Sequence, residues 1–159
     1  MKILVLSDSH GAVSKIVSAI GREKPECVIF LGDKVCDILG VCDNYAGVQF
    51  IIVSGNCDGS GSYTGFSERI VTVLDDVTFY ITHGHNERVK WGYMDLISKA
   101  FEFDANIALF GHTHMTCKNN YSGLELLNPG SIGQGDYGIV LLGDGKIETY
   151  LKNINDLSC

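Results

Sequence analysis

Short runs of apolar residues recur along the chain, and each gives way to a polar or glycine-rich segment. Continuous runs of this kind, rich in Val and Ile, predict strands that are buried on both faces of a sheet. The runs span residues 3–6, 28–31, 50–53, 77–81, 107–110 and 138–142. The pattern therefore predicts a strand in each of these six segments.

Two other segments carry apolar residues at helical spacing. Residues 12–22 have them at positions 13, 16, 17 and 20, and residues 91–103 at positions 91, 94, 97, 100 and 101, so both predict amphipathic helices. The second half adds short strands at 125–127 and 146–151, and Asp144-Gly145 is typical of a hairpin turn. These elements predict one α/β domain over residues 1–159, with sheets packed between helices.

Clusters of Gly, Asp, Asn and His directly follow five of the predicted strands. They are Ser7-Asp8-Ser9-His10-Gly11, Gly32-Asp33, Ser54-Gly55-Asn56-Cys57-Asp58, His83-Gly84-His85 and Gly111-His112-Thr113-His114. All five histidines of the chain lie in these clusters. Because the loops at the carboxyl ends of parallel strands converge at one edge of an α/β sheet, we expect these side chains to form one site.

The donor types in these clusters favour a metal centre. Asp8 and His10 stand two residues apart, as do His112 and His114, so each pair projects from one side of an extended segment. Imidazole, carboxylate and amide donors suit divalent ions such as Mn²⁺, Fe²⁺, Ni²⁺ or Zn²⁺. So many donors would crowd a single ion, whereas two ions that share one bridging carboxylate could use them all.

The net charge of −7 narrows the class of substrate. Proteins that bind long nucleic acids gain affinity from clustered Lys and Arg, and the 12 basic residues here form no cluster. We therefore expect no long nucleic acid as partner. An anionic substrate would need bound cations as its source of positive charge.

The remaining composition predicts a cytoplasmic protein with no membrane partner. The apolar stretches are far shorter than the roughly 20 residues that span a bilayer. The N-terminal run leads straight into charged residues without a signal-peptide cleavage site. The six cysteines include no C-x-x-C pair, so we expect free thiols and no structural zinc site.

The ordered clusters resemble the calcineurin-like metallophosphoesterase superfamily, whose pattern is D-x-H, G-D, G-N-[HC]-[DE], H-G and G-H-x-H. The match runs from Asp8 to His114 with order and spacing intact. The short length, the Gly-Asn-Cys-Asp and His-Gly-His motifs and the later Asn128-Pro129-Gly130-Ser131 resemble the compact prokaryotic phosphodiesterase branch. This resemblance implies a four-layer αββα sandwich, in which helices flank two mixed β-sheets.

The resemblance also implies a metal ligand set. Ligands of a first ion are matched by Asp8, His10 and His114, those of a second ion by Asn56, His83 and His112, and the bridging carboxylate by Asp33. Two divalent ions, with Mn²⁺ preferred and Ni²⁺, Fe²⁺ or Zn²⁺ as alternatives, could clamp the phosphoryl oxygens. They could also activate a shared water, so that metal-bound hydroxide attacks phosphorus directly.

Position 57 departs from the pattern of many family members, which carry His directly after the Asn. This chain has Cys57, a residue that the family associates with diesters and with loss of monoester activity. The expected function is therefore hydrolysis of a small phosphodiester. The group that protonates the leaving alcohol stays open. Cys57, Asp58 and His85 are the catalytic candidates, and Asp58 could instead orient a neighbouring group.

Structural roles and other functions are the alternatives. Asp8 could cap the helix predicted at 12–22, and Asn56 could be a turn residue beside Gly55. Asn128-Pro129-Gly130-Ser131 would be a turn in any case, and by resemblance lies near the metals. A phosphomonoesterase is the nearest functional alternative, and a non-catalytic interaction scaffold of the same fold, as in a retromer subunit, is the more distant one. Small members of this branch are often dimers or larger, so a homo-oligomer also stays open.

Overall fold

Two five-stranded sheets carry the fold in the computed structural model, which describes residues 1–59 and 65–156. The first sheet has the strand order β10-β9-β1-β2-β3 and the second the order β4-β5-β6-β8-β7. The first sheet consists of β1 (Lys2–Leu6), β2 (Cys27–Phe30), β3 (Gln49–Ile52), β9 (Asp136–Gly143) and β10 (Lys146–Asn153). The second consists of β4 (Arg69–Leu74), β5 (Val77–Thr82), β6 (Ile107–Leu109), β7 (Thr116–Tyr121) and β8 (Leu124–Pro129).

Both sheets are mixed. In the first, β1, β2 and β3 run parallel, and β9 and β10 join β1 as an antiparallel hairpin. In the second, β5, β6 and β8 are parallel, while β4 and β7 pair antiparallel at the two edges. Asp144 and Gly145 have φ values of 51° and 70° in the β9–β10 turn, which confirms the predicted hairpin.

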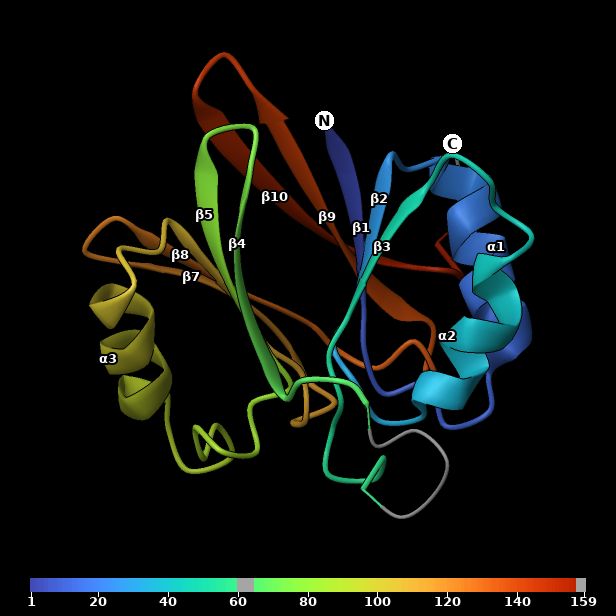
Figure 1. Cartoon of the computed structure of the whole chain (residues 1–159), viewed down its shortest axis with the longest axis horizontal. Helices are drawn as coiled ribbons and strands as arrows, with labels where there is room; N and C mark the ends of the chain where they lie inside the picture. The colour runs from blue at the N-terminus through green and yellow to red at the C-terminus, as the bar shows by residue number, and fades with distance from the viewer. Residues whose placement is uncertain (60–64, 157–159) are drawn as a thin grey trace.

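Helices cover the outer faces of the two sheets. Figure 1 shows α1 (Val13–Glu23) and α2 (Val35–Cys42) against the first sheet and α3 (Met94–Glu102) against the second. Separate apolar clusters fill the space between the sheets and the space under the helices on each side. The predicted four-layer αββα sandwich is therefore confirmed.

The alternation of side chains along β1 explains how a continuous apolar run serves two layers. Ile3 and Val5 face the cluster between the sheets, whereas Leu4 and Leu6 face the cluster beneath α1 and α2. All four side chains are fully buried, as expected for a strand covered on both faces. The same expectation is wrong for 50–53, because β3 is an edge strand and is only partly covered.

Three elements escaped the sequence pattern, namely α2, β4 and β7. The predicted helix at 91–103 also begins later, at Met94. The five cysteines that the structure describes carry free thiols, and Cys159 lies outside the described residues. None of the helices in the described part of the chain has the length and hydrophobicity of a membrane-spanning segment.

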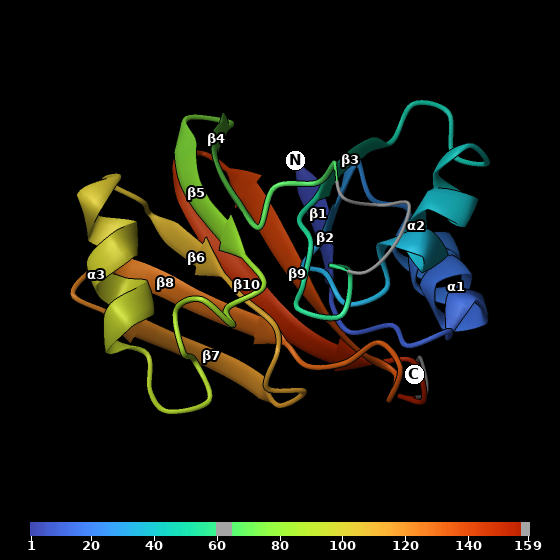
Figure 2. The same cartoon turned by 60° about the horizontal axis from the view of Figure 1, so that its bottom comes forward.

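The strand directions bring the polar clusters together. β1, β2 and β3 end beside the ends of β5 and β6, at the bottom of the view in Figure 1, and Figure 2 turns this end forward. Hydrogen bonds join the loops at this point: the Asp8 N–H donates to the Gly32 carbonyl at 3.0 Å and the Gly111 N–H to the His83 carbonyl at 2.9 Å. The fold thus assembles the five clusters at one end of the sandwich.

Candidate metal centre

Two overlapping groups of donor side chains meet at this end of the sandwich. One contains Asp8, His10, Asp33 and His114, and the other contains Asp33, His83 and His112. Within each group the donor atoms all lie within 4.8 Å of one another. Asp33 is common to both groups, so its carboxylate lies where a bridge between two ions would be needed.

Many of these residues have an unusual backbone conformation. Positive φ angles occur at Asp8 (54°), His10 (44°), Asp33 (60°), His112 (66°) and His114 (58°). Left-handed backbone is uncommon for residues other than glycine and concentrates at functional sites, where the surrounding structure holds the strain. Its recurrence in the two donor groups indicates that the loops are shaped to direct these side chains inward.

Two glycines make the close approach of the loops possible. A Cβ atom at Gly111 would collide with the Ser7 hydroxyl and the Asp8 carboxylate. A Cβ atom at Gly55 would collide with the Asp33 carboxylate and the Asp33 backbone nitrogen. The glycines of the G-H-x-H and G-N motifs are therefore required by packing against the predicted ligands.

The carboxylate of Asp8 has one oxygen held by the protein and one that is not. Its Oδ2 accepts hydrogen bonds from the Ser7 hydroxyl at 2.5 Å and the His112 N–H at 3.1 Å. Its Oδ1 is buried and has no hydrogen-bond partner of good geometry among the described residues, although His114 Nε2 lies 3.1 Å away. A buried carboxylate oxygen without a donor is costly, and it fits a site that holds a cation.

The imidazoles of the first group turn their nitrogens toward each other. His10 Nε2 lies 3.4 Å from His114 Nε2, and the ring centroids are 5.1 Å apart. Together with the free oxygen of Asp8, these nitrogens form a set of nitrogen and oxygen donors suited to a divalent ion.

The orientation of His83 follows from one hydrogen bond. Its Nδ1 lies 2.7 Å from the Leu31 carbonyl, and because a carbonyl can only accept, Nδ1 carries the proton. The lone pair is thus left on Nε2, which faces Asp33 Oδ2 at 3.5 Å and His112 Nδ1 at 3.2 Å. A backbone carbonyl that fixes the tautomer in this way is typical of metal-binding histidines.

The charges around Asp33 prepare the second group for a cation. Burial acts to raise the pKa of Asp33, but His83 and the Cys57 N–H outweigh it and hold that pKa below its usual range. Burial together with the neighbouring charges of His83 and Lys90 lowers the pKa of His112 to about 4. Burial also opposes charge on His83, yet Asp33 and Asp8 raise the pKa of His83 above its usual value. The carboxylates that favour a proton there would equally favour a metal ion.

Asn56 and Cys57 lie on the exposed loop after β3. The Cys57 N–H donates to Asp33 Oδ1 at 2.9 Å, and the Asn56 amide lies 3.4 Å from Cys57 Sγ. Burial and the adjacent Asp33 carboxylate raise the pKa of the Cys57 thiol. The loop therefore presents a neutral thiol beside the shared carboxylate.

The carboxylate of Asp58 faces the backbone. Its oxygens accept four N–H groups, from Asp33 at 2.9 Å and from Lys34, Val35 and Gly55 at 2.8 Å each. These contacts tie the loop after β2 to the loop after β3. In this structure Asp58 holds the loops that carry Asp33 and Asn56.

His85 lies beside the second donor group but is not a member of it. Its ring centroid is 5.5 Å from that of His83 and 6.1 Å from that of His112. Its Nδ1 is buried without a hydrogen-bond partner in the part of the chain that the structure describes. Its Nε2 lies 3.8 Å from Glu68.

The Asn128–Ser131 segment, which begins at the end of β8, contacts the ligand loops. The Asn128 amide donates to the Gly111 carbonyl at 2.9 Å and to the Thr113 hydroxyl at 3.0 Å. The Ser131 hydroxyl donates to the Asp8 carbonyl at 2.7 Å. The motif thus supports the site, but the predicted turn at these residues is wrong, because Asn128 and Pro129 end β8 and the turn follows at residues 132–135.

The alternative role for Asp8 as a helix cap is wrong. Helix α1 has Ala12 at its N-cap and no side-chain hydrogen bond there, and the carboxylate of Asp8 faces the donor groups. Asp37, in the first turn of α2, accepts hydrogen bonds from the Ser9 hydroxyl and the Gly11 N–H, both at 2.7 Å. It anchors the first ligand loop to α2, a role that its sequence position did not indicate.

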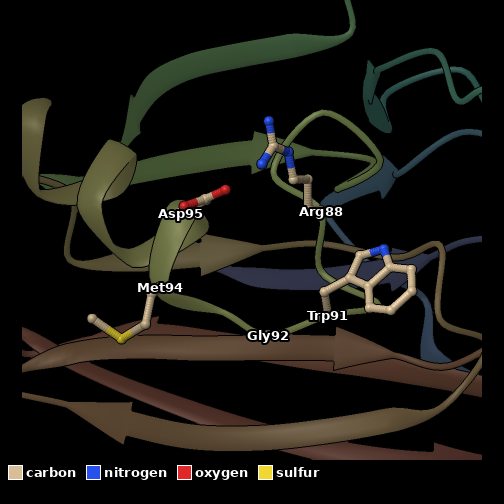
Figure 3. A pocket seen from close by; sticks show the side chains of 5 residues that line it. All are labelled: Arg88, Trp91, Gly92, Met94 and Asp95. Carbon is tan, nitrogen blue, oxygen red and sulfur yellow. The ribbon is translucent and has the colours of Figure 1, made fainter.

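A pocket of about 260 Å³ is lined by the segment between His85 and α3 and by the first residues of α3. Its described lining consists of Arg88, Trp91, Gly92, Met94 and Asp95 (Figure 3), which include none of the predicted ligands. Trp91 is the single tryptophan of the chain and is 92% exposed. The pocket is therefore distinct from the candidate metal centre, although its lining residues closely follow His83 and His85 in the sequence.

Sequence comparisons point to one family. A family model for the calcineurin-like phosphoesterase superfamily domain matches residues 1–145. A probable metallophosphoesterase of Bacillus subtilis is 28% identical over 134 residues, which cover 83% of this chain and 75% of the relative. A phosphodiesterase of Methanocaldococcus jannaschii is 29% identical over 146 residues, which cover 82% and 83% of the two chains.

Solved structures agree with this assignment. The crystal structure of a predicted phosphoesterase from Streptococcus pneumoniae has a TM-score of 0.77 and 28% identity, covering 97% of this chain and 90% of the other. Vps29 from Entamoeba histolytica, crystallised with zinc, has a TM-score of 0.70 and 21% identity, covering 98% and 100%. The second likeness shows the fold alone. Because the family model matches residues 1–145 of the 159 in this chain, the chain belongs to the calcineurin-like phosphoesterase superfamily.

Proposed function

We propose that this protein is a phosphodiesterase that hydrolyses a small phosphodiester with two divalent metal ions. The observation that carries the proposal is the position of Asp33, whose carboxylate belongs to both donor groups. A side chain shared in this way suits two neighbouring ions better than one. The phosphodiesterase among the relatives supports the same reaction class.

Each ion would have its own ligands. We assign Asp8, His10 and His114 to the first ion, Asn56, His83 and His112 to the second, and Asp33 to both. Bound there, the ions would supply Lewis-acid stabilisation of the phosphoryl oxygens and activation of a water nucleophile. We propose Mn²⁺ as the metal, with Ni²⁺, Fe²⁺ or Zn²⁺ as alternatives, since nitrogen and oxygen donors suit all of these ions.

The protein's own groups hold these donors in place. The Ser7 hydroxyl and the His112 N–H fix one oxygen of Asp8, so that the other stays directed into the site. The Leu31 carbonyl holds the proton of His83 on Nδ1, and the Cys57 N–H fixes Asp33. Prior alignment of this kind lowers the cost of arranging ligands when the ions and the substrate bind.

Preference for a diester is supported by the neutral thiol at position 57. A phosphomonoester carries more negative charge than a diester, and an imidazole at this position could neutralise that charge or donate a proton. The Cys57 thiol, whose pKa is raised, supplies no positive charge. We propose His85 as the residue that contacts the substrate's leaving group, since its Nδ1 is unpartnered among the described residues. We propose Asp58 as a residue that orients the loops.

The proposal is tested by comparing two model substrates on protein reloaded with Mn²⁺. We expect kcat/KM for bis(4-nitrophenyl) phosphate to exceed that for 4-nitrophenyl phosphate by at least about tenfold. Cys57→His should raise the relative rate on the monoester by about tenfold or more, because an imidazole can donate a proton. Cys42→Ser, at the end of α2 that lies away from the contacts of Asp58, is the matched control. A clear monoester preference of the unaltered protein would contradict the assignment.

A further inference from the structure

Glu87 is a buried acidic residue that has no place in the ligand set. It lies two residues after His85 and is only 2% exposed. Its Oε1 accepts the Tyr80 hydroxyl and its Oε2 the Thr82 hydroxyl, both at 2.9 Å. The Lys99 ammonium on α3 lies 3.6 Å from Oε1. The carboxylate therefore links β5, the loop after it and α3.

The contacts of Thr82 carry this link to a predicted metal ligand. Thr82 directly precedes His83, and its hydroxyl oxygen accepts the Gly84 N–H at 3.2 Å while it donates to Glu87. Thr82 and Gly84 are the two chain neighbours of His83, so this pair of hydrogen bonds fixes the backbone on both sides of the ligand. The Glu87 carboxylate accepts the last hydrogen bond of this chain, which runs from the Gly84 N–H through the Thr82 hydroxyl.

The turn that carries His83 is held on its other side by packing. Gly84 has a φ of 104°, and a Cβ atom there would meet the side chain of Val89. The Val89 N–H also donates to the Gly84 carbonyl at 3.2 Å. The turn therefore lies between two sets of contacts: the hydrogen bonds that join Glu87, Thr82 and Gly84, and the packing of Val89 against Gly84. We expect a change in either set to move His83.

A buried charge is a poor choice where only stability is needed. Replacing a buried ionic group by well-packed apolar residues is often neutral or stabilising, because the cost of desolvation offsets the attraction between the charges. A carboxylate here does what an apolar side chain cannot, since it fixes two hydroxyls at once. One of these hydroxyls, that of Thr82, also accepts the N–H of Gly84, which directly follows His83.

We propose that Glu87 is a positioning residue that sets the orientation of His83 through Thr82. This inference rests on the proposed role of His83 as a ligand of the second ion. It assigns Glu87 no contact with substrate or metal. Hydrogen-bond partners one step behind metal ligands commonly change metal affinity by 10–100-fold when they are altered, so the effect of Glu87 should be measurable.

Glu23 provides a matched control within the same chain. It is 6% exposed and, like Glu87, accepts a tyrosine hydroxyl and pairs with lysine: Tyr137 and Lys152 lie at 2.9 Å and Lys2 at 2.6 Å. None of these partners is a predicted ligand. The change Glu23→Gln therefore perturbs a comparable buried network away from His83.

The test compares four variants: Glu87→Gln, Thr82→Val, Thr82→Ser and Glu23→Gln. Calorimetric titration with Mn²⁺ measures the two dissociation constants, and NMR hydrogen exchange of the Gly84 amide in metal-free protein measures the turn itself. We expect Glu87→Gln and Thr82→Val to weaken one of the two Mn²⁺ sites by about tenfold and to speed Gly84 exchange by about tenfold. Thr82→Ser keeps the hydroxyl and should restore both quantities to near the values of the unaltered protein.

Glu23→Gln should lower the melting temperature while leaving Mn²⁺ affinity and Gly84 exchange unchanged. The inference is overturned if Glu87→Gln affects only the melting temperature, as Glu23→Gln does, or if Thr82→Ser fails to restore the turn. Failure of the proposed function looks different. In that case the unaltered protein binds no pair of Mn²⁺ ions, while the exchange of Gly84 still decides whether Glu87 positions the turn.

Discussion

Gly111 is one of the residues whose identity is constrained by close packing in the site. Added bulk at this position would press on the Ser7 hydroxyl and the Asp8 carboxylate. We therefore expect Gly111→Ala to lower the free energy of unfolding by about 1–3 kcal/mol, which is typical of overpacking. We also expect it to weaken metal binding, because Asp8 must move. Urea unfolding and Mn²⁺ titration measure the two effects.

Gly143 offers the control for this substitution. It ends β9, and a Cβ atom there would meet nothing within 4 Å among the described residues. Gly143→Ala should leave both the stability and the Mn²⁺ affinity near those of the unaltered protein. Equal effects of the two substitutions would show that the close approach at Gly111 does not matter.

Individual residues also show which parts of the site could be predicted from the sequence. The order of Asp, Asn and His clusters after apolar runs predicted which side chains meet, and Asp8, Asp33 and His83 do meet. The family resemblance separated Asp33, a predicted ligand, from Asp58, but it left open whether Asp58 is catalytic or orients a neighbouring group. Only the backbone path shows that the oxygens of Asp58 are taken up by N–H groups.

Helix α2 and the loop after β3 depend on one another through Asp58. Its carboxylate accepts the N–H groups of Lys34 and Val35 at the start of α2 and that of Gly55 in the loop. A negative charge at a helix N-terminus is also favourable. Asp58→Asn replaces one acceptor oxygen by a donor, so we expect a loss of about 1.5–3 kcal/mol in the free energy of unfolding.

Chemical denaturation measures this loss, and Asp43→Asn is its control. Asp43 lies exposed at the other end of α2, and a surface change of this kind should stay within about 0.5 kcal/mol. Asp58→Asn should also weaken Mn²⁺ binding, because Asp33 and Asn56 lie on the two loops that Asp58 joins. Unchanged stability would mean that the four contacts do not hold the loops.

Elements with a strong period or a long apolar run were predictable, and others were not. The period of residues 12–22 matches α1 closely. Strand β7 has the sequence Thr-Cys-Lys-Asn-Asn-Tyr and escaped because an exposed edge strand needs no apolar run. Helix α2 escaped for the opposite reason, since a short and largely apolar segment shows little helical period.

In the whole molecule, the site connects the two sheets, because its residues form hydrogen bonds between loops of both. Asp8 follows β1 in the first sheet, and its carboxylate accepts the N–H of His112, which follows β6 in the second. His83, after β5, bonds to the carbonyl of Leu31, after β2. The family resemblance implied two stacked sheets, but their strand order depends on contacts between distant segments that no local pattern encodes. The extent of a single domain over 1–159 stays a prediction.

Glu23 on α1 contacts side chains from three strands of the first sheet. Its carboxylate makes the stability of the fold depend on pH. Burial acts to raise its pKa, but Lys2, Lys152 and Tyr137 outweigh it and lower the pKa to about 2. A lowered carboxylate pKa contributes stability above the unfolded value near 4.5 and loses it as the pH falls toward the folded value. We expect this contribution to reach about 2–3 kcal/mol at neutral pH.

Urea unfolding of the unaltered protein and of Glu23→Gln between pH 2 and pH 7 tests this expectation. The difference in the free energy of unfolding between the two proteins should be constant at neutral pH. It should shrink as the pH falls from about 4.5 toward about 2. If the free energies of unfolding of the two proteins ran parallel over the whole pH range, groups other than Glu23 would cause the pH dependence.

The proposed function requires a pair of ions bridged by Asp33, and the metal content of the protein shows whether this pair forms. After reloading with Mn²⁺, mass spectrometry should find close to two ions per chain in the unaltered protein and in the control Asp43→Ala. Asp33→Ala should retain at most one ion and lose turnover of bis(4-nitrophenyl) phosphate by more than about 100-fold. A metal content near zero in the unaltered protein, as a scaffold would give, would rule out the bridged pair. An Asp33→Ala variant that keeps two ions and full turnover would rule out Asp33 as the bridge.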